Sequence, residues 1–180
     1  LVRIRLGSLE PLYMTEEIIK EMSSVEKLCP HFHLSLQSGC DETLSRMNRR
    51  YTAAEFSEIV KNIRKYNKDV AITTDIMTGF PGETEEEFQK TCAFVESIGF
   101  SQAHIFQYSI RKGTKAANME EHIPASIKEE RSKVLTEICE RTMHNFRENQ
   151  VGKTADVLYE EKHDDYYTGH TGNYIPVRGF

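Results

Sequence analysis

The feature that most constrains this chain is a regular alternation of strand-like and helix-like segments. Four strand-like segments begin roughly thirty to forty residues apart, with a helix-like segment in each gap. The predicted strands are Val2–Leu6, Phe32–Gln37, Val70–Thr78 and Gln102–Tyr108. Strands joined by helices in this way lie parallel in one sheet. Because four strands are too few to close a βα barrel, the sequence predicts an incomplete barrel of the α/β class.

Four predicted helices carry their own start signals. The first three are Thr15–Leu28, Thr52–Tyr66 and Thr84–Ile98. Thr52 with Glu55, and Thr84 with Glu87, match the capping box, in which each side chain satisfies a free backbone amide of the first turn. A longer helix is predicted from Ser126, capped through Ser126-x-x-Glu129, to about Asn149. Its apolar positions are Val134, Leu135, Ile138, Met143 and Phe146.

The chain therefore divides into three predicted parts. Residues 1–125 form the partial barrel, residues 126–150 a connecting helix, and residues 151–180 the start of a second, small β domain. In that last part we expect one strand at Thr154–Tyr159 and another within Gly169–Val177. Roughly 30 residues cannot form a stable core alone, so this β domain is expected to be truncated. The opening at Leu1, in the middle of a strand pattern, suggests a piece of a longer protein.

Composition narrows the classes of function. No apolar run approaches the ~20 residues that span a bilayer, which favours a cytoplasmic protein without a membrane partner. The net charge of −5 argues against non-specific coating of nucleic acid, although a local basic patch is compatible with it. The four cysteines are Cys29, Cys40, Cys92 and Cys139. Their spacing is too wide for a zinc or iron–sulfur motif, so we predict no metal site and interpret them as thiols in a reducing cytosol.

The predicted strands are unusual because polar residues occupy alternate positions along them. Parallel strands covered by helices normally read as apolar runs, but here Arg5, His33, Gln37 and Asp75 alternate with apolar residues. Side chains alternate across a strand, so one sheet face should meet the helices and the other should face a polar barrel interior. Two interpretations stay open: Asp75 pairs internally with an arginine of the first strand, or this interior binds a charged ligand.

The C-terminal ends of all four predicted strands carry Gly, Ser or charged residues. Ligands of parallel α/β folds bind at this edge, because glycines permit close backbone approach and helix N-termini attract anions. The four segments are residues 7–11, 37–40, 78–84 and 108–114. One such loop is weak evidence, but four at one edge of the sheet indicate a binding site.

These same segments resemble the radical S-adenosylmethionine (SAM) methylthiotransferases. The shared motifs are Arg3-Ile-Arg-Leu-Gly-Ser-Leu-Glu-Pro11, His33-Leu-Ser-Leu-Gln-Ser-Gly39, Met47-Asn-Arg-Arg-Tyr-Thr52, Thr73-Thr-Asp-Ile-Met-Thr-Gly-Phe-Pro-Gly-Glu-Thr84 and Tyr108-Ser-Ile-Arg-Lys-Gly-Thr114. The resemblance implies an enzyme whose radical SAM barrel has six βα units, of which these strands would be the third to sixth. It also implies that residues 151–180 begin a TRAM domain, a small RNA-binding β-barrel.

The cofactors that the resemblance implies are SAM and two [4Fe–4S] clusters in the full-length protein. This chain lacks the Cys-x-x-x-Cys-x-x-Cys loop of the family, so we expect no cluster on it and no activity from it alone. Its catalytic residues are therefore unknown. By match of motifs, the expected SAM-binding residues are Ser8, Glu10, Gln37, Ser38, Asp75, Thr78, Gly79 and Gly82. For each of them, a hydrogen bond that only stabilises a loop is the alternative.

The implied partner is tRNA, at its anticodon stem-loop. Candidate RNA-binding residues are Arg49, Arg50, Arg111, Lys115 and Tyr174, where arginines suit phosphate and a tyrosine suits base stacking. Arg46 and Tyr51 belong to the same cluster as Arg49 and Arg50. A solvated surface explains this cluster almost as well. The open edge of the partial barrel, at Val2–Leu6, also predicts self-association.

Three substrate branches of the family compete. The sequence most resembles the one that adds a methylthio group to threonylcarbamoyladenosine beside the tRNA anticodon. The other two act on isopentenyladenosine in tRNA and on an aspartate of a ribosomal protein. An interpretation of another class, a non-catalytic RNA-binding or assembly module, also remains open.

Overall fold

The computed structural model describes residues 2–180, and its centre is a parallel sheet in the order β1-β2-β3-β4. The strands are β1 (Ser8–Leu9), β2 (His31–Gln37), β3 (Ala71–Thr78) and β4 (Gln102–Gln107). Neighbouring strands are neighbours in sequence, and all three pairings are parallel, with Ser8 opposite His33 and Asp75 opposite His104. The expectation of four consecutive βα-type strands, open at both edges, is confirmed.

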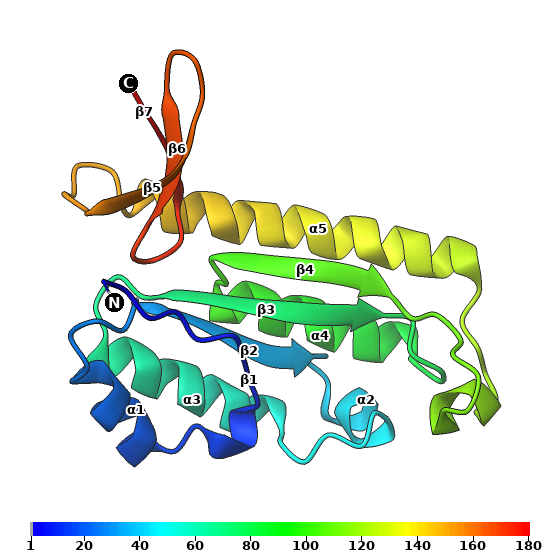
Figure 1. The fold of residues 1–180 in the computed structure, drawn as a ribbon. Coiled ribbons are helices and arrows are strands. Elements are labelled where there is room, and N and C mark those ends of the chain that lie inside the picture. Colours follow the sequence, from blue (N-terminus) through cyan, green and yellow to red (C-terminus); the bar gives the residue numbers. More distant parts are fainter. Residues whose placement is uncertain (1) are drawn as a thin grey trace.

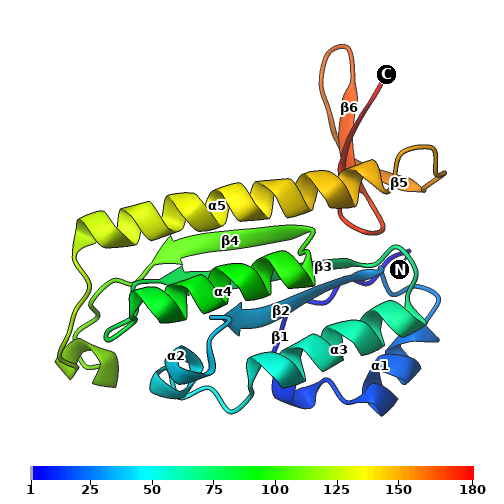
Figure 2. The same ribbon diagram turned by 180° about the vertical axis from the view of Figure 1, so that it is seen from behind.

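The helices cover one face of this sheet. Figure 2 shows α3 and α4 in front of the strands, whereas in the opposite view of Figure 1 the sheet lies in front of α4. Their bounds are α1 (Glu16–Ser23), α2 (Asp41–Arg46), α3 (Ala53–Tyr66), α4 (Glu85–Ile98) and α5 (Ala125–Glu148), with short 3-10 turns η1 (Pro11–Tyr13) and η2 (Lys115–Asn118). Both predicted capping boxes, at Thr52 and Thr84, are present. The short helix α2 was not predicted.

The first predicted strand was placed wrongly. The paired strand is Ser8–Leu9 rather than Val2–Leu6, in which only Ile4 forms an isolated parallel bridge, to Leu28. The physical reason is a competing set of partners. The Ile4 backbone bonds to Lys27 and Cys29 in the turn before β2, and Arg3 donates to two carbonyl groups of the C-terminal sheet. The edge proposed for self-association is thus a two-residue strand, and the self-association itself stays a prediction.

The long helix α5 begins and packs differently from the expectation. Pro124 occupies the N-cap position without a side-chain hydrogen bond, so Ser126 lies inside the first turn and is not the cap. The buried residues are Arg131, Leu135, Ile138, Cys139 and Thr142. Val134, expected on the apolar face, is 37% exposed. The buried face of α5 is therefore rotated away from the purely apolar stripe, because it includes a charged residue whose partner lies on another element.

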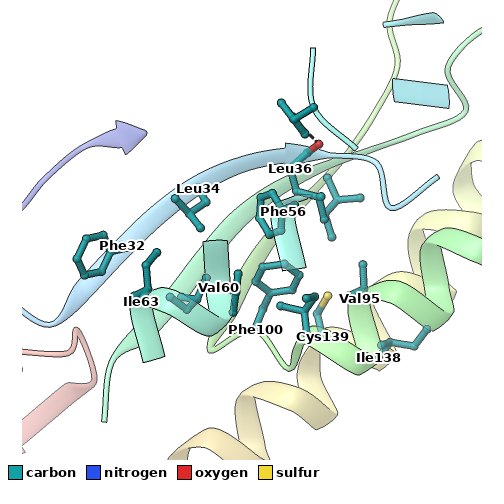
Figure 3. Packing of buried hydrophobic residues seen from close by; sticks show 14 of the residues in the cluster. Phe32, Leu34, Leu36, Phe56, Val60, Ile63, Val95, Phe100, Ile138 and Cys139 are labelled. Atoms are coloured by element: carbon teal, nitrogen blue, oxygen red, sulfur yellow. Dashed lines mark hydrogen bonds between the residues drawn. The ribbon is translucent and has the colours of Figure 1, made fainter. Parts of the chain in front are cut away.

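The core lies between the apolar face of the sheet and the helices. Figure 3 shows alternate residues of β2 facing side chains of α3, α4 and α5. The labelled residues are Phe32, Leu34, Leu36, Phe56, Val60, Ile63, Val95, Phe100, Ile138 and Cys139. Because α5 contributes Leu135, Ile138 and Cys139 to this cluster, it packs as a layer of the same unit. Within residues 2–180, no helix has both the length and the apolar character needed to cross a membrane.

The C-terminal segment forms a separate antiparallel sheet in the order β5-β6-β7. Its strands are β5 (Val157–Lys162), β6 (Tyr167–Thr171) and β7 (Pro176–Gly179), one more strand than was expected. Figures 1 and 2 both show this sheet beside the N-terminal ends of β2 and β3, opposite the arrowheads of the parallel strands. Arg3, in the segment before β1, contacts this C-terminal segment by donating to the carbonyls of Asp156 (2.9 Å) and His170 (3.2 Å).

Candidate functional site

The sheet face that carries no helices is polar, as the alternation predicted. Its open cavity of about 380 Å³ is lined by Arg5, His33 and Asp75 together with other side chains, some from each of the four strands. Those others include His31, Thr73, Gln102, His104 and Ser8. Gln37 is not among the residues that line this cavity, and the register between β2 and β3 shifts between Leu34 and Gln37. The placement of Gln37 on this face stays a prediction.

Four of these side chains form a continuous row across β2 and β3. Thr73 Oγ1 lies 3.1 Å from His31 Nε2 and 3.0 Å from His33 Nδ1, and His33 Nε2 lies 3.3 Å from an Asp75 carboxylate oxygen. Burial, and then the nearby charges of Arg5 and His33, lower the pKa of His31 to about 4. His31 is therefore neutral at physiological pH.

The side chain that contacts the Asp75 carboxylate is His33 and not an arginine of the first strand. Arg3 points to the carbonyls of the C-terminal sheet, and the Arg5 guanidinium lies 4.2 Å from the centre of the Tyr174 ring. The interpretation in which Asp75 pairs internally with one of these arginines is thus wrong. Both cations instead have partners in the C-terminal segment. Such partners depend on the tertiary fold, and the pattern of residues along a strand cannot reveal them.

At the C-terminal edge of the sheet, two predicted site residues bind each other. Arg49, expected to contact RNA, donates to the carboxylate of Glu10, expected to contact SAM, at 3.1 Å. Both side chains are about one-third exposed (30% and 34%), so this ion pair at the rim remains accessible to solvent. Ser8, two residues before Glu10, is exposed and lines the polar cavity.

Gln37, the last residue of β2, and Ser38, which follows it, have different environments. Gln37 has a left-handed backbone, with φ of 67°, and is buried. Ser38 is fully buried; its hydroxyl lies 3.1 Å from the Thr91 hydroxyl and accepts from the Cys40 amide. The Ser38 hydroxyl thus stabilises the junction between β2 and α2, which matches the alternative of a loop-stabilising hydrogen bond.

The loop after β3 contains the remaining predicted SAM-binding residues. Thr78 is buried, with its hydroxyl 2.8 Å from that of Ser132, while Gly79 and Gly82 adopt φ of 69° and 76°. A Cβ at Gly79 would clash with the Lys128 side chain, so this glycine is required by the packing of α5 as well as by its backbone angle.

Sequence reasoning missed a buried ion pair that holds this loop. Glu83 accepts from Arg131 Nη1 at 2.7 Å and from the Gly79 amide at 2.8 Å, and the two charged side chains are 2% and 7% exposed. Burial raises the pKa of the Glu83 carboxyl, although the Gly79 amide and Arg131 both favour its charged form. The available signal was Arg131 itself, which lies four residues before Leu135 on the face that should be apolar.

The basic cluster after β2 is only partly available to RNA. Arg46 forms an ion pair with Glu87, with Nη1 3.0 Å from one carboxylate oxygen. Tyr51 is buried, its hydroxyl donates to the Ser35 and Leu36 carbonyls, and burial raises its pKa to about 12. Arg50 remains exposed. The cluster is thus largely structural, with Arg50 as its accessible cation.

The other predicted RNA-binding residues lie at opposite ends of the sheet. Arg111, Lys112 and Lys115 are exposed in the connector after β4, and among residues 2–180 they form no ion pair. Tyr174 instead lies at the N-terminal end of the strands, with its ring centre 4.5 Å from that of His170 and 5.1 Å from that of His31. Tyr174 and Arg111 are therefore not parts of one contact surface.

The cysteines do not converge on a site. All four are buried and free, and the Cys40 thiol donates to Glu42 at 2.9 Å. Burial, followed by that hydrogen bond, raises the pKa of Cys40. Across the part of the chain that the structure describes, no group of three or more Cys, His, Asp or Glu residues is arranged to hold a metal ion. The described residues thus do not fit an iron–sulfur cluster.

Comparison with known proteins identifies the family to which the chain is similar. The model of the radical SAM superfamily matches residues 2–95. The chain is 41% identical over 176 residues to a protein of Thermotoga maritima named threonylcarbamoyladenosine tRNA methylthiotransferase MtaB, covering 93% of this chain and 41% of that protein. It is 46% identical over 158 residues to a tRNA-2-methylthio-N(6)-dimethylallyladenosine synthase of Clavibacter michiganensis, covering 88% of this chain and 30% of that protein.

Two solved structures share the fold at low sequence identity. Coproporphyrinogen III oxidase HemN of Escherichia coli, described as a radical SAM enzyme, aligns with a TM-score of 0.66 at 13% identity over 78% of this chain and 32% of that one. Elp3 of the archaeon Methanocaldococcus infernus aligns with a TM-score of 0.55 at 12% identity over 98% of this chain and 56% of that one. The chain spans less than half the length of the two methylthiotransferases that it matches.

Proposed function

This chain belongs to the radical SAM methylthiotransferases, and we propose that the whole protein adds a methylthio group to threonylcarbamoyladenosine beside the anticodon of tRNA. The observation that carries this proposal is the likeness to MtaB along nearly the whole chain, including the connector after β4. The proposed partner is the anticodon stem-loop, and the proposed location is the cytoplasm.

The proposed cofactor is SAM, bound at the C-terminal edge of the parallel strands. Ser8 and Asp75, which line the polar cavity, would hold it together with the backbone of the Thr78–Gly82 loop, which begins at the C-terminal end of β3. Bound SAM would supply the radical that activates the substrate carbon. The contribution of this chain's residues is to bind and orient the cofactor, and the Asp75–His33 pair keeps a carboxylate at that face. The two [4Fe–4S] clusters of the family would be held by residues outside this chain.

Substrate choice is proposed to rest on the cations after β4. Threonylcarbamoyladenosine carries a carboxylate, whereas an isopentenyl group is apolar, so a site for the former needs a cation near the rim. Arg111 and Lys115 are exposed there and have no acidic partner among the described residues, so they are available to a ligand. A guanidinium can bind a carboxylate through two parallel hydrogen bonds. Loss of such a contact costs about 1–3 kcal/mol.

A second candidate substrate has its own support. The relative from Clavibacter is more identical over the residues that it matches, and its name gives dimethylallyladenosine as the modified nucleoside. The same barrel edge would serve that reaction, with an apolar group in place of the carboxylate. The two candidates therefore differ only in what the rim loops contact.

The C-terminal sheet is proposed to begin the RNA-binding TRAM-like domain, with residues 1–125 as the partial barrel and 126–150 as the helix between them. Supporting this, β5, β6 and β7 present exposed Tyr159 and Tyr167, and Arg178 lies 3.5 Å from the centre of the Tyr166 ring. Aromatic and guanidinium groups of this kind stack on unpaired bases.

Mass spectrometry of tRNA nucleosides from a strain lacking the gene tests the substrate. We expect loss of methylthio-threonylcarbamoyladenosine while methylthio-isopentenyladenosine remains. The opposite pattern selects the second candidate and excludes the first. Complementation with Arg111→Ala and Lys115→Ala should restore the nucleoside poorly, whereas Lys133→Ala, an exposed lysine on α5 paired with Glu129, is the matched control and should restore it fully.

A further inference from the structure

Three residues on one face of α5 contact the ends of β3 and β4 and the loop after β3. Lys128, Arg131 and Ser132 are spaced three and four residues apart, which places them side by side on the helix. The Ser132 hydroxyl lies 2.8 Å from that of Thr78, and Lys128 Nζ donates to the Tyr108 carbonyl at 2.8 Å. One helix face thus touches the C-terminal end of β3 and the residue just after β4.

Arg131 makes the most extensive of these contacts. Its Nη1 donates to both the carboxylate (2.7 Å) and the backbone carbonyl (3.0 Å) of Glu83. The same carboxylate oxygen of Glu83 accepts from the Gly79 amide, so the guanidinium fixes the group that fixes the first residue of the loop. Both ends of the segment from Gly79 to Glu83 are therefore held through one arginine.

Lys128 packs directly against the backbone of the loop at Gly79. Its aliphatic chain occupies the space where a Cβ of residue 79 would lie, so helix and loop backbone are in direct contact. Gly79 satisfies two requirements at once there, a positive φ and the absence of a side chain.

The chemistry of the Arg131–Glu83 ion pair indicates that it orients the loop, in addition to any contribution to stability. A buried ion pair rarely stabilises a protein more than apolar residues of the same size, because removing two charges from water offsets their attraction. What a paired guanidinium adds is direction, since its donors fix the orientation of the acceptors. The Leu135, Ile138 and Cys139 contacts already attach α5 to the core, so Arg131 is not needed for that.

We propose that Lys128, Arg131 and Ser132 are positioning residues for SAM, acting through the Thr78–Glu83 loop that they hold. This inference rests on the proposed function, in which that loop binds the cofactor. Figure 1 shows α5 running from the C-terminal edge of the sheet to the C-terminal sheet at the other end. The helix that sets the cofactor loop therefore also sets its distance from the proposed RNA-binding sheet.

Steady-state kinetics of the whole protein, with hydrogen exchange of residues 78–88, tests the inference. Arg131→Met leaves the Glu83 charge buried, so it is combined with Glu83→Gln to keep the fold intact. We expect this double variant and Ser132→Ala to raise the KM for SAM, the double variant by about tenfold or more, with the KM for tRNA unchanged. Exchange of the Gly79 amide should rise by about tenfold in the double variant.

Two further variants separate positioning from general stability. Arg131→Lys retains a donor and should recover part of the affinity for SAM. Arg141→Met removes an exposed arginine of the same helix, paired with Glu96, and should change neither KM nor exchange. The inference is overturned if the loop exchanges faster in the double variant while the KM for SAM is unchanged, or if exchange does not respond at all. Absence of SAM cleavage and tRNA modification in the wild-type protein would instead overturn the proposed function.

Discussion

At the scale of single residues, neighbouring groups on one sheet face have very different environments. His31 is buried under the Tyr174 ring, whereas His33, two residues later, faces Asp75 in the open cavity. Both histidines share the Thr73 hydroxyl. The row of polar groups therefore has a neutral end near the C-terminal sheet and a carboxylate at its other end.

His31 predicts a specific loss of stability in acid. Its pKa is lowered to about 4 in the folded chain, against 6.5 when exposed, so on acidification the unfolded chain binds the proton first. The stabilisation is complete above pH 6.5 and falls away between pH 6.5 and 4. From pH 7 to 5 the loss from this group is about 2 kcal/mol. Thermal melts of His31→Gln should show a weaker pH dependence over that range, while exposed His144→Gln should behave like the wild type.

Asp75 offers a test of whether the polar cavity is functional. Its pair with His33 is partly open, with 32% of the Asp75 side chain exposed, so Asp75→Leu should cost less than about 1 kcal/mol of stability. If the cavity binds SAM, the same change should abolish SAM cleavage by the whole protein. Melting curves recorded beside SAM turnover distinguish the effects. A large drop in melting temperature with proportionate loss of activity would show that Asp75 is structural.

At the scale of elements, the junctions between strands and helices decide how the rim is built. Gly39, between β2 and α2, has no room for a side chain, because a Cβ there would lie 2.7 Å from the Phe94 Cβ on α4. Gly7, just before β1, has open space instead, with nothing within 4 Å of the point that a Cβ would occupy. These two glycines, one before the start of β1 and one after the end of β2, thus differ in whether the fold leaves room for a side chain.

This contrast gives a matched pair of substitutions. Gly39→Ala should lower the free energy of unfolding by about 1–3 kcal/mol, because the added methyl group overpacks the contact between β2 and α4. Gly7→Ala should change it by less than about 0.5 kcal/mol. Urea denaturation followed by circular dichroism measures both. Equal effects of the two substitutions would contradict the packing at Gly39.

At the scale of the whole molecule, the two sheets meet through aromatic and cationic groups. Tyr174 contacts Arg5 of the N-terminal segment and His31 of β2, and Arg3 binds backbone carbonyls of the C-terminal sheet. Asn173 adds a hydrogen bond to the Asp69 carbonyl at 3.0 Å. The contact between the sheets therefore lies at the end of the barrel strands away from the proposed cofactor edge.

Tyr174→Ala should loosen this contact without unfolding the parallel sheet. The stacked and cation–π contacts of its ring contribute about 1–2 kcal/mol together. Hydrogen exchange should rise in residues 156–180 and stay constant in β2 and β3. Tyr13→Ala, which removes a tyrosine that is 72% exposed, serves as the control and should change neither region. If hydrogen exchange in residues 156–180 does not rise after Tyr174→Ala, other contacts, such as those of Arg3, hold the sheets together.

The sequence by itself determined the fold class, the capping boxes at Thr52 and Thr84, the polar sheet face and the family. These depend on local patterns: strand alternation, the spacing of a cap from its partner, and motifs at strand ends. The positions of β2, β3, α3 and α4 were predicted within a residue or two for the same reason. Helix α2 escaped prediction because its six residues carry no periodic signal.

Only the tertiary structure decided the partners of the charged residues. Glu10 binds Arg49, Asp75 binds His33 and Glu83 binds Arg131, and each pair joins elements that are distant in sequence. The first strand lies at Ser8–Leu9 instead of Val2–Leu6 for the same kind of reason. Arg3 and Ile4 form hydrogen bonds with other parts of the fold. A charged side chain reaches several ångströms and accepts any opposite charge within that reach. Its partner therefore depends on how the elements pack, which no local pattern encodes.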